Sequence, residues 1–154
     1  MTDVPLPALQ AALAGEHAAL WACGRAAGRL SGAERTRALG QLDAHRRARD
    51  ALRRRVIEAG GQPVEAAPAY LEPTPVTSAA TARALLAHIA TAMVAVHADL
   101  AAATTGRDRA EAVADAVGSA RDAVAWGAPA TAFPGAVTTS ADQPSALPTE
   151  RDQS

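Results

Sequence analysis

Prolines and glycines divide this chain into four segments, and the lengths of the breaks between them limit how it can fold. Ser31-Gly32 and Thr105-Gly106 are short breaks, whereas residues 62–77 contain four of the ten prolines. A proline lacks the amide hydrogen that a helix interior needs, so residues 62–77 are not expected to be helical. Two helices joined by a short turn run antiparallel as neighbours. The pattern therefore predicts two helical hairpins joined by one long connection.

This connection is long enough to run the full length of a helix. Residues 61–77 can reach roughly 56 Å at about 3.3 Å per residue, whereas a helix of about 26 residues is roughly 39 Å long. The third helix can therefore run parallel to the second. Two antiparallel hairpins joined by one long crossover define the ferritin-like arrangement of a four-helix bundle. We predict an all-α chain of this fold class.

Capping residues mark the ends of the helices. The capping-box sequence Ser31-Gly-Ala-Glu34 and the similar Asp108-Arg-Ala-Glu111 are expected to start the second and fourth helices, and Thr77 or Ser78 to cap the third. The predicted helices comprise approximately residues 7–30, 32–59, 78–105 and 108–128. We therefore expect residues 6–128 to form the bundle and residues 129–154 to form a tail rich in Pro, Ser and Thr, disordered beyond Gly135.

Composition favours helices and excludes several protein classes. Hydrophobic residues make up 49% of the chain but aromatic residues only 3%, because much of the apolar content is Ala, the best helix former. The net charge of −1 gives no strong field toward nucleic acid or an anionic membrane. Cys23 is alone, no signal peptide is recognisable, and His and Asp interrupt the apolar stretches before about 18 residues. We expect a cytoplasmic protein that does not associate with membranes.

Each predicted helix has a stripe of residues at alternating spacings of four and three, which indicates the face toward the core. In the third and fourth helices the stripe is apolar throughout, and in the fourth it comprises Ala110, Val113, Val117, Ala120 and Val124. The first stripe contains Glu16 at its middle, and the second contains His45 and Arg49. The sequence therefore predicts a polar layer inside the bundle.

The hairpin geometry identifies candidate partners for Glu16. In an antiparallel hairpin that turns near residues 31 and 32, Glu16 lies level with about residue 47. A buried carboxylate needs a partner, and a guanidinium can offer two hydrogen bonds. We predict Arg49 as the partner and His45 as the second candidate, in a polar layer that comprises Glu16, His17, His45, Arg46 and Arg49. In the alternative interpretation, Glu16 is partly exposed and bonded to water.

Four segments of the chain occur together in a recognisable order. They are GEHAALWACGRAAGRLSG, LDAHRRARDALRRRV, APAYLEPTPVTSAATARAL and, after the last helix, AFPG. Their Glu-His pair, Arg-rich second helix and Tyr- and Pro-containing crossover resemble an actinobacterial family of ferritin-like domains of unknown function. The similarity covers about residues 8–135. It implies a ferritin-like bundle and supplies no activity.

Most of the ligands of a di-iron site are missing. Ferritin-like di-iron proteins use a Glu on each of two helices and a Glu-x-x-His motif on each of the other two. Glu16 fits one such position, but Asp43 and His45 are two residues apart and point to different faces. We therefore expect no cofactor and a degenerate metal site. The alternative is iron or manganese in an atypical site made of Glu16, His17, His45 and His97.

Two surface features are further candidates for function. One flank of the first helix combines small and aromatic residues: His17, Trp21, Gly24 and Gly28. This flank is a candidate homodimer interface, and the alternative is tight packing inside one bundle. The second helix has an arginine cluster that could bind nucleic acid: Arg46, Arg47, Arg49, Arg53, Arg54 and Arg55. These arginines spread around the helix among acidic residues, without aromatic residues for base stacking, so nucleic-acid binding is not expected.

Three function classes follow from these features. We favour a non-catalytic bundle that acts through its surface or as a dimer, and we assign no catalytic residue. The second class is a metal-dependent, di-iron-like oxidoreductase, and the third is a binder of nucleic acid through arginines.

Overall fold

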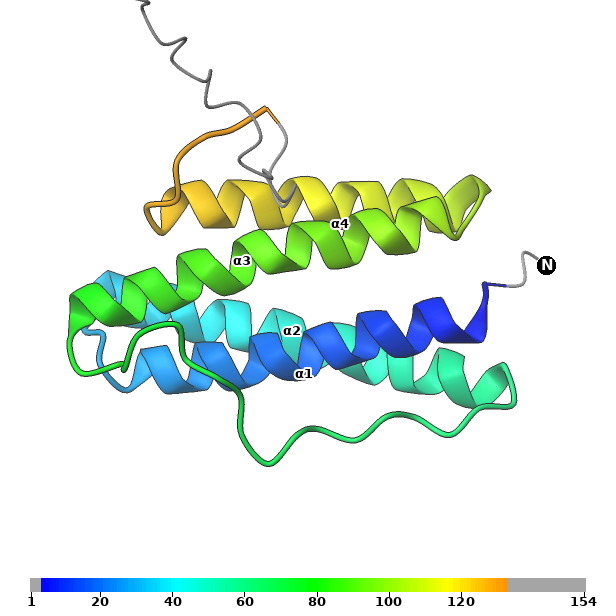
Figure 1. Ribbon diagram of the computed structural model, residues 1–154, viewed down its shortest axis with the longest axis horizontal. Coiled ribbons are helices and arrows are strands. Elements are labelled where there is room, and N and C mark those ends of the chain that lie inside the picture. Colours follow the sequence, from blue (N-terminus) through cyan, green and yellow to red (C-terminus); the bar gives the residue numbers. More distant parts are fainter. Residues whose placement is uncertain (1–3, 133–154) are drawn as a thin grey trace, which may run out of the picture.

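The computed structural model describes residues 4–132, which form a bundle of four α-helices. The helices are α1 (Leu6–Ala27), α2 (Gly32–Glu58), α3 (Ala79–Ala102) and α4 (Gly106–Ala125). α1 and α2 form one hairpin and α3 and α4 a second, and α1 packs against α3 (Figure 1). The predicted all-α four-helix bundle is confirmed. Of the predicted tail, residues 133–154 lie outside the described residues.

The connection between the hairpins, residues 59–78, runs back along the first hairpin before α3 begins (Figure 1). α2 and α3 therefore run in the same direction. A salt bridge between Arg25 of α1 and Glu72 holds the end of this connection, and Glu72 also accepts a 2.8 Å hydrogen bond from the Val76 amide. The connection thus forms one side wall of the first hairpin.

Two of the three predicted helix starts, after Ser31 and Ser78, match the structure, but only Ser78 makes the predicted capping bonds. Ser78 accepts a hydrogen bond from the Thr81 amide, and the Thr81 side chain bonds back to the Ser78 amide, which makes a capping box for α3. The Ser31 side chain makes no capping bond, and α4 begins at Gly106, before the predicted start at Asp108. The two short turns are made instead by glycines with φ of 53° and 56°, a left-handed conformation that glycine adopts without strain.

The buried apolar residues form two clusters, one toward each end of the bundle. One cluster contains Leu30, Leu86 and Trp126, and the other contains Leu13 and Val56. Between the clusters the core is polar, because Glu16, His97 and Ser119 are buried there. Buried polar residues, of which Glu16 alone belongs to the predicted layer, therefore lie between the two halves of the apolar core.

The predicted core face of α4 is wrong. Val113, Val117 and Val124 are 45–48% exposed, whereas the buried residues of this helix are Ala112, Ser119 and Ala123. Alanines lie on every side of α4, so the valine spacing alone did not identify the inner face. The three valines therefore lie in a line along the outer side of α4.

Within the described residues, α3 is the one helix that is long and apolar enough to cross a membrane by length and composition. This corrects the expectation that no apolar segment reaches that length. The most apolar window of α3 has a mean hydropathy of 1.6 and is 39% buried inside the bundle. Core helices of bundles meet the same criterion, and α3 packs against both α1 and α4.

Candidate functional site

A row of four polar side chains, one from each helix, crosses the middle of the bundle. Glu16 of α1 accepts a 2.7 Å hydrogen bond at Oε2 from Nδ1 of His45 on α2. Its other oxygen, Oε1, lies 3.5 Å from Nε2 of His97 on α3, and Nδ1 of His97 lies 3.2 Å from Oγ of Ser119 on α4. We call these four residues the polar layer. It connects all four helices through side chains.

The environment of Glu16 favours its charged form. Burial alone would raise the pKa of this carboxyl, because only 3% of Glu16 is exposed. The hydrogen-bonding and charge interactions with His45 and His97 outweigh burial, so the pKa of Glu16 lies below its ordinary value. The layer therefore holds a carboxylate between two imidazoles.

The polar layer does not fit a di-metal site. Each oxygen of Glu16 faces a different imidazole nitrogen, and a carboxylate bridging two cations would need those oxygens free. Within residues 4–132, no group of three or more His, Cys, Asp or Glu side chains is placed to hold a metal ion. The small cavity beside the layer, lined by Cys23 and His45 among others, has a volume of about 20 Å³, roughly the space that one water needs.

The structure brings together some of the predicted layer residues and separates others. Glu16 contacts His45, the second candidate, whereas Arg49 bonds to Asp50 at 2.8 Å. The predicted Glu16–Arg49 pair is therefore wrong, because an acid adjacent in sequence pairs with the guanidinium. Arg46 likewise bonds to Asp43, and His17 lies 3.1 Å from the carbonyl oxygen of Val64.

Sequence reasoning named His97 only as a ligand of the alternative metal site and missed Ser119. Of the four residues of that alternative, Glu16, His45 and His97 come together, with His97 only 8% exposed, whereas His17 contacts Val64 instead. Ser119 was not singled out, because the valine stripe placed the inner face of α4 elsewhere. A stripe through Ala112, Ser119 and Ala123 would have identified it, but alanines give no contrast between faces.

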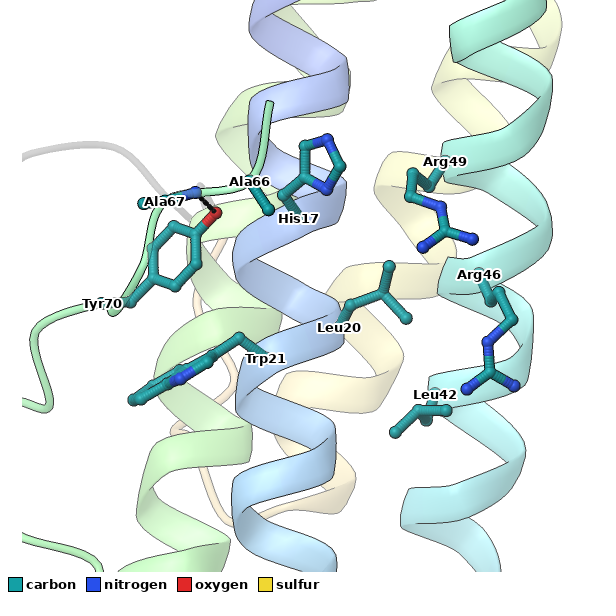
Figure 2. A pocket seen from close by; sticks show the side chains of 9 residues that line it. All are labelled: His17, Leu20, Trp21, Leu42, Arg46, Arg49, Ala66, Ala67 and Tyr70. Carbon is teal, nitrogen blue, oxygen red and sulfur yellow. Dashed lines mark hydrogen bonds between the residues drawn. The ribbon is translucent and has the colours of Figure 1, made fainter. Parts of the chain in front are cut away.

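A second feature is a lateral groove on the first hairpin, with a volume of about 320 Å³. Its lining residues come from α1, α2 and the connection: His17, Leu20, Trp21, Leu42, Arg46, Arg49, Ala66, Ala67 and Tyr70. In Figure 2, the two arginines and Leu42 lie on the α2 side, Trp21 and Tyr70 lie on the opposite side, and Leu20 lies between them. We call this space the lateral groove.

The two sides of the lateral groove differ in chemistry. Trp21 and Tyr70 pack together with ring centroids 5.7 Å apart, and the Tyr70 hydroxyl accepts a 3.1 Å hydrogen bond from the Ala67 amide. The arginine side chains each have one carboxylate partner, which leaves guanidinium N–H groups without a partner. His17 donates from Nε2 to Val64, since a carbonyl oxygen can only accept. The groove therefore has an aromatic pair on one side and two arginines, each ion-paired with one carboxylate, on the other.

The candidate homodimer interface on α1 lies mostly beneath the connection. His17 bonds to Val64, and Trp21 packs against Tyr70, so these two side chains are in contact with this chain's own residues. Gly24 and Gly28 remain beyond that contact, and a Cβ at Gly24 would lie 3.5 Å from Leu42. The arrangement matches the alternative interpretation of this flank, which was packing inside one bundle.

Most of the arginine cluster of α2 is paired with acidic residues. Salt bridges join four of the six arginines to carboxylates: Arg46 to Asp43, Arg49 to Asp50, Arg53 to Glu65 and Arg55 to Asp108. Arg47 and Arg54 have no salt-bridge partner among the described residues. The cluster therefore offers no continuous cationic face.

Comparison with known proteins identifies a family. Residues 8–138 match the model of a family described as a domain of unknown function, DUF4439. The chain is similar to the crystal structure of a conserved hypothetical protein, Rv2844, from Mycobacterium tuberculosis, with 28% identity and a TM-score of 0.73. That match covers 78% of this chain and 92% of the other. None of the curated proteins matches. Because the family model spans most of the chain, this protein belongs to the DUF4439 family.

Proposed function

We propose that this chain is a ferritin-like bundle that works as a non-catalytic binding protein through its lateral groove. The observation that carries the proposal is the position of Glu16. Both of its carboxylate oxygens face imidazole nitrogens, so side chains of the protein itself fill the centre of the bundle. The lateral groove is open and offers aromatic and cationic groups. Binding sites commonly combine apolar walls with a few oriented polar groups.

The ferritin-like assignment rests on helix order and direction. Two hairpins with a long crossover, which makes α2 and α3 parallel, are the features of that arrangement. An up-down-up-down bundle would join α2 and α3 by a short turn. The sequence resemblance described above supports the same assignment.

Two other functions receive less support. An iron- or manganese-dependent oxidoreductase would need Glu16, His45 and His97 to turn their donor atoms toward a common point, and His17 is bonded to the connection instead. Nucleic-acid binding would need a row of free cationic groups along α2, where most arginines are paired with carboxylates.

We also propose that two copies pair through the outer face of α4. The exposed valines 113, 117 and 124 lie along one side of this helix, which gives an apolar strip. Arg121 has no salt-bridge partner within residues 4–132, and Glu111, which is paired with Arg107 of the same helix, lies near the opposite end of the strip. Antiparallel pairing of two α4 helices about Val117 would bring Glu111 of one copy close to Arg121 of the other, which favours a second copy as the occupant.

One experiment separates the proposed function from the metal-dependent enzyme. The full chain is purified without a tag, incubated with iron or manganese under reducing conditions, desalted, and analysed for metal. We expect well below one metal ion per chain, and the same value for a Glu16→Gln variant. Stoichiometric metal that is lost in the Glu16→Gln variant would show that the centre of the bundle is a metal site and would refute the proposal.

The binding part of the proposal needs its own experiment. A mixed set of neutral, cationic and anionic small molecules is screened by ligand-observed NMR against the full chain and against Ala66→Trp, which fills the lateral groove. Some members should bind to the unmodified chain and none to Ala66→Trp. Equal binding to both proteins, or no binding at all, would contradict the groove as the working surface.

A further inference from the structure

We infer that the lateral groove binds a small aromatic anion, whose charged group contacts Arg49 and Arg46 and whose ring lies against Trp21 and Tyr70. This inference rests on the proposed function of the groove and names the class of ligand. It follows from the volume of the groove, the chemistry of its two sides and the position of the acidic residues around it.

The volume of about 320 Å³ sets the size of the ligand. It lies at the lower end of the usual range for small-molecule sites, roughly 300–1,000 Å³. A compound with one or two fused rings is small enough to occupy such a space. The groove is therefore suited to a small molecule.

The aromatic side supports a flat, apolar body. Trp21 and Tyr70 are fixed relative to each other by their ring contact, and the hydroxyl of Tyr70 is held by the Ala67 amide. Leu20 and Leu42 add apolar surface between this pair and the arginines (Figure 2). Rings bind favourably against such preorganised aromatic side chains.

The cationic side supports a negatively charged group. In Figure 2 the Arg49 side chain lies at the edge of α2 that faces α1, and the Arg46 side chain lies over α2 and runs along it toward Leu42. Their carboxylate partners, Asp43 and Asp50, are not among the lining residues, so no acidic side chain lines the groove itself. A guanidinium has five N–H groups, and one carboxylate contact leaves several of them available. Asp50 contacts Nε and Nη2 of Arg49 and Asp43 contacts Nη1 of Arg46, so a carboxylate or phosphate, the usual partners of a guanidinium, would bind the remaining N–H groups.

The test uses the full chain and three probes with the same ring system. They are 2-naphthoate, 2-naphthyl phosphate and the uncharged 2-naphthylmethanol, and affinity is measured by calorimetry. We expect the better of the two anions to bind about tenfold or more tightly than the alcohol, since each tenfold step corresponds to one strong charge-assisted contact. The comparison of carboxylate with phosphate shows which anion the arginines prefer.

Variants test the role of the arginines. Arg49→Ala is expected to weaken anion binding about tenfold and to leave binding of the alcohol unchanged, and Arg49→Lys to give an intermediate value because it keeps charge but loses the planar fork. Arg47→Ala is the matched control, since Arg47 is on the same helix, is exposed and does not line the groove. Its affinity for all three probes should equal that of the unmodified chain.

The two tryptophans locate the binding event. The indole N–H signal of Trp21 in a two-dimensional NMR spectrum should shift on addition of 2-naphthoate, whereas that of Trp126, which donates a 2.8 Å hydrogen bond to Gln41 on another face, should not. The inference is wrong if the alcohol binds as tightly as the anions, if none of the probes binds, or if Arg47→Ala weakens binding as much as Arg49→Ala. If instead neutral or cationic compounds bind and Ala66→Trp abolishes their binding, the groove keeps its proposed function and only the anionic ligand class fails.

Discussion

Glu16 and His45 face each other across the first hairpin, with 2.7 Å between Oε2 of the carboxylate and Nδ1 of the imidazole. The two side chains differ in exposure, because Glu16 is 3% exposed and His45 is 23% exposed. Removal of Glu16 and removal of His45 are therefore expected to affect the remaining partner differently. Without His45, Glu16 keeps only the longer contact with His97, whereas His45 without Glu16 can still reach water.

The coupling between Glu16 and His45 is open to a double-mutant cycle. Glu16→Ala should lower the free energy of unfolding by about 2 kcal/mol, less than for a fully buried pair because His45 is partly exposed. Replacing both residues, as Glu16→Leu with His45→Leu, should cost less than the sum of the two single leucine changes. The measurement is urea denaturation of the unmodified chain, Glu16→Ala, the two single leucine variants and the double leucine variant. Additive single changes would mean that the two residues do not interact.

The stability of the bundle should depend on pH through Glu16. Its pKa is lower in the folded chain than in the unfolded chain, so the unfolded state binds a proton more readily. The stabilisation is therefore fully present above about pH 4.5, the ordinary value, and is lost as the pH falls through the lower folded pKa. Urea denaturation of the unmodified chain and of Glu16→Gln should show a difference in stability that shrinks at acid pH. A difference that stays constant would contradict this assignment.

Two glycines of α1 should respond differently to alanine. At Gly24 a Cβ would lie at an ordinary 3.5 Å from Leu42, so Gly24→Ala should stabilise the protein by about 0.5–1 kcal/mol through helix propensity. At Gly15 a Cβ would lie 3.0 Å from Val96 and 3.2 Å from Met93, so crowding against α3 should offset that gain. Thermal unfolding of both variants measures the difference. An equal gain at Gly15 and Gly24 would show that α1 and α3 have room between them.

Cys23 should be unreactive in the folded chain. Burial, with smaller contributions from the negative charges of Asp122 and Glu16, raises the pKa of this thiol to about 12, so almost no thiolate is present at neutral pH. A disulfide reagent such as dithionitrobenzoate should modify Cys23 slowly in buffer and rapidly in concentrated urea. Fast modification without denaturant would indicate that the small cavity beside the polar layer opens readily to solvent.

The proposed pairing through α4 predicts a mass of twice 15.6 kDa by light scattering. Val117→Asp should reduce it to the mass of one chain, because a charge would be buried at the centre of the interface. Leu71→Asp is the control, since Leu71 is 98% exposed on the connection, away from α4. A mass of 15.6 kDa for the unmodified chain at high concentration would refute the dimer.

The sequence predicted the bundle well because the breaks between helices are strong local features. Four prolines and two glycine turns mark the ends of the hairpins, and the apolar stripe predicted for the third helix includes residues that are buried in α3, such as Leu86, Met93 and Leu100. Glu16 was placed at the core by the same reasoning, and the hairpin arithmetic brought His45 to its level. These predictions depend on chain geometry and side-chain size, which the sequence gives directly.

Other parts of the site could not be predicted. Glu16 pairs with His45 and not with Arg49 because of the side-chain rotamers and because Asp50 competes for the guanidinium. The spacing of residues along the chain gives no information on either. Which face of α4 points inward depends on the rotation of this helix about its axis as it packs against α3. Because alanines lie on every side of α4, side-chain size alone does not determine this rotation. The lateral groove could not be predicted without the position of the connection, whose path is set by tertiary contacts such as the salt bridge between Arg25 and Glu72.

The connection between the hairpins separates the evolution of the groove from the evolution of the fold. Ala66, Ala67 and Tyr70 line the groove from the connection, which belongs to no helix and adds one residue, Val76, to the apolar clusters. Substitutions or length changes there can alter which molecules enter, while the helices and the polar layer stay as they are. Under the proposed function, the ligand specificity of relatives with the same bundle is expected to depend on this segment.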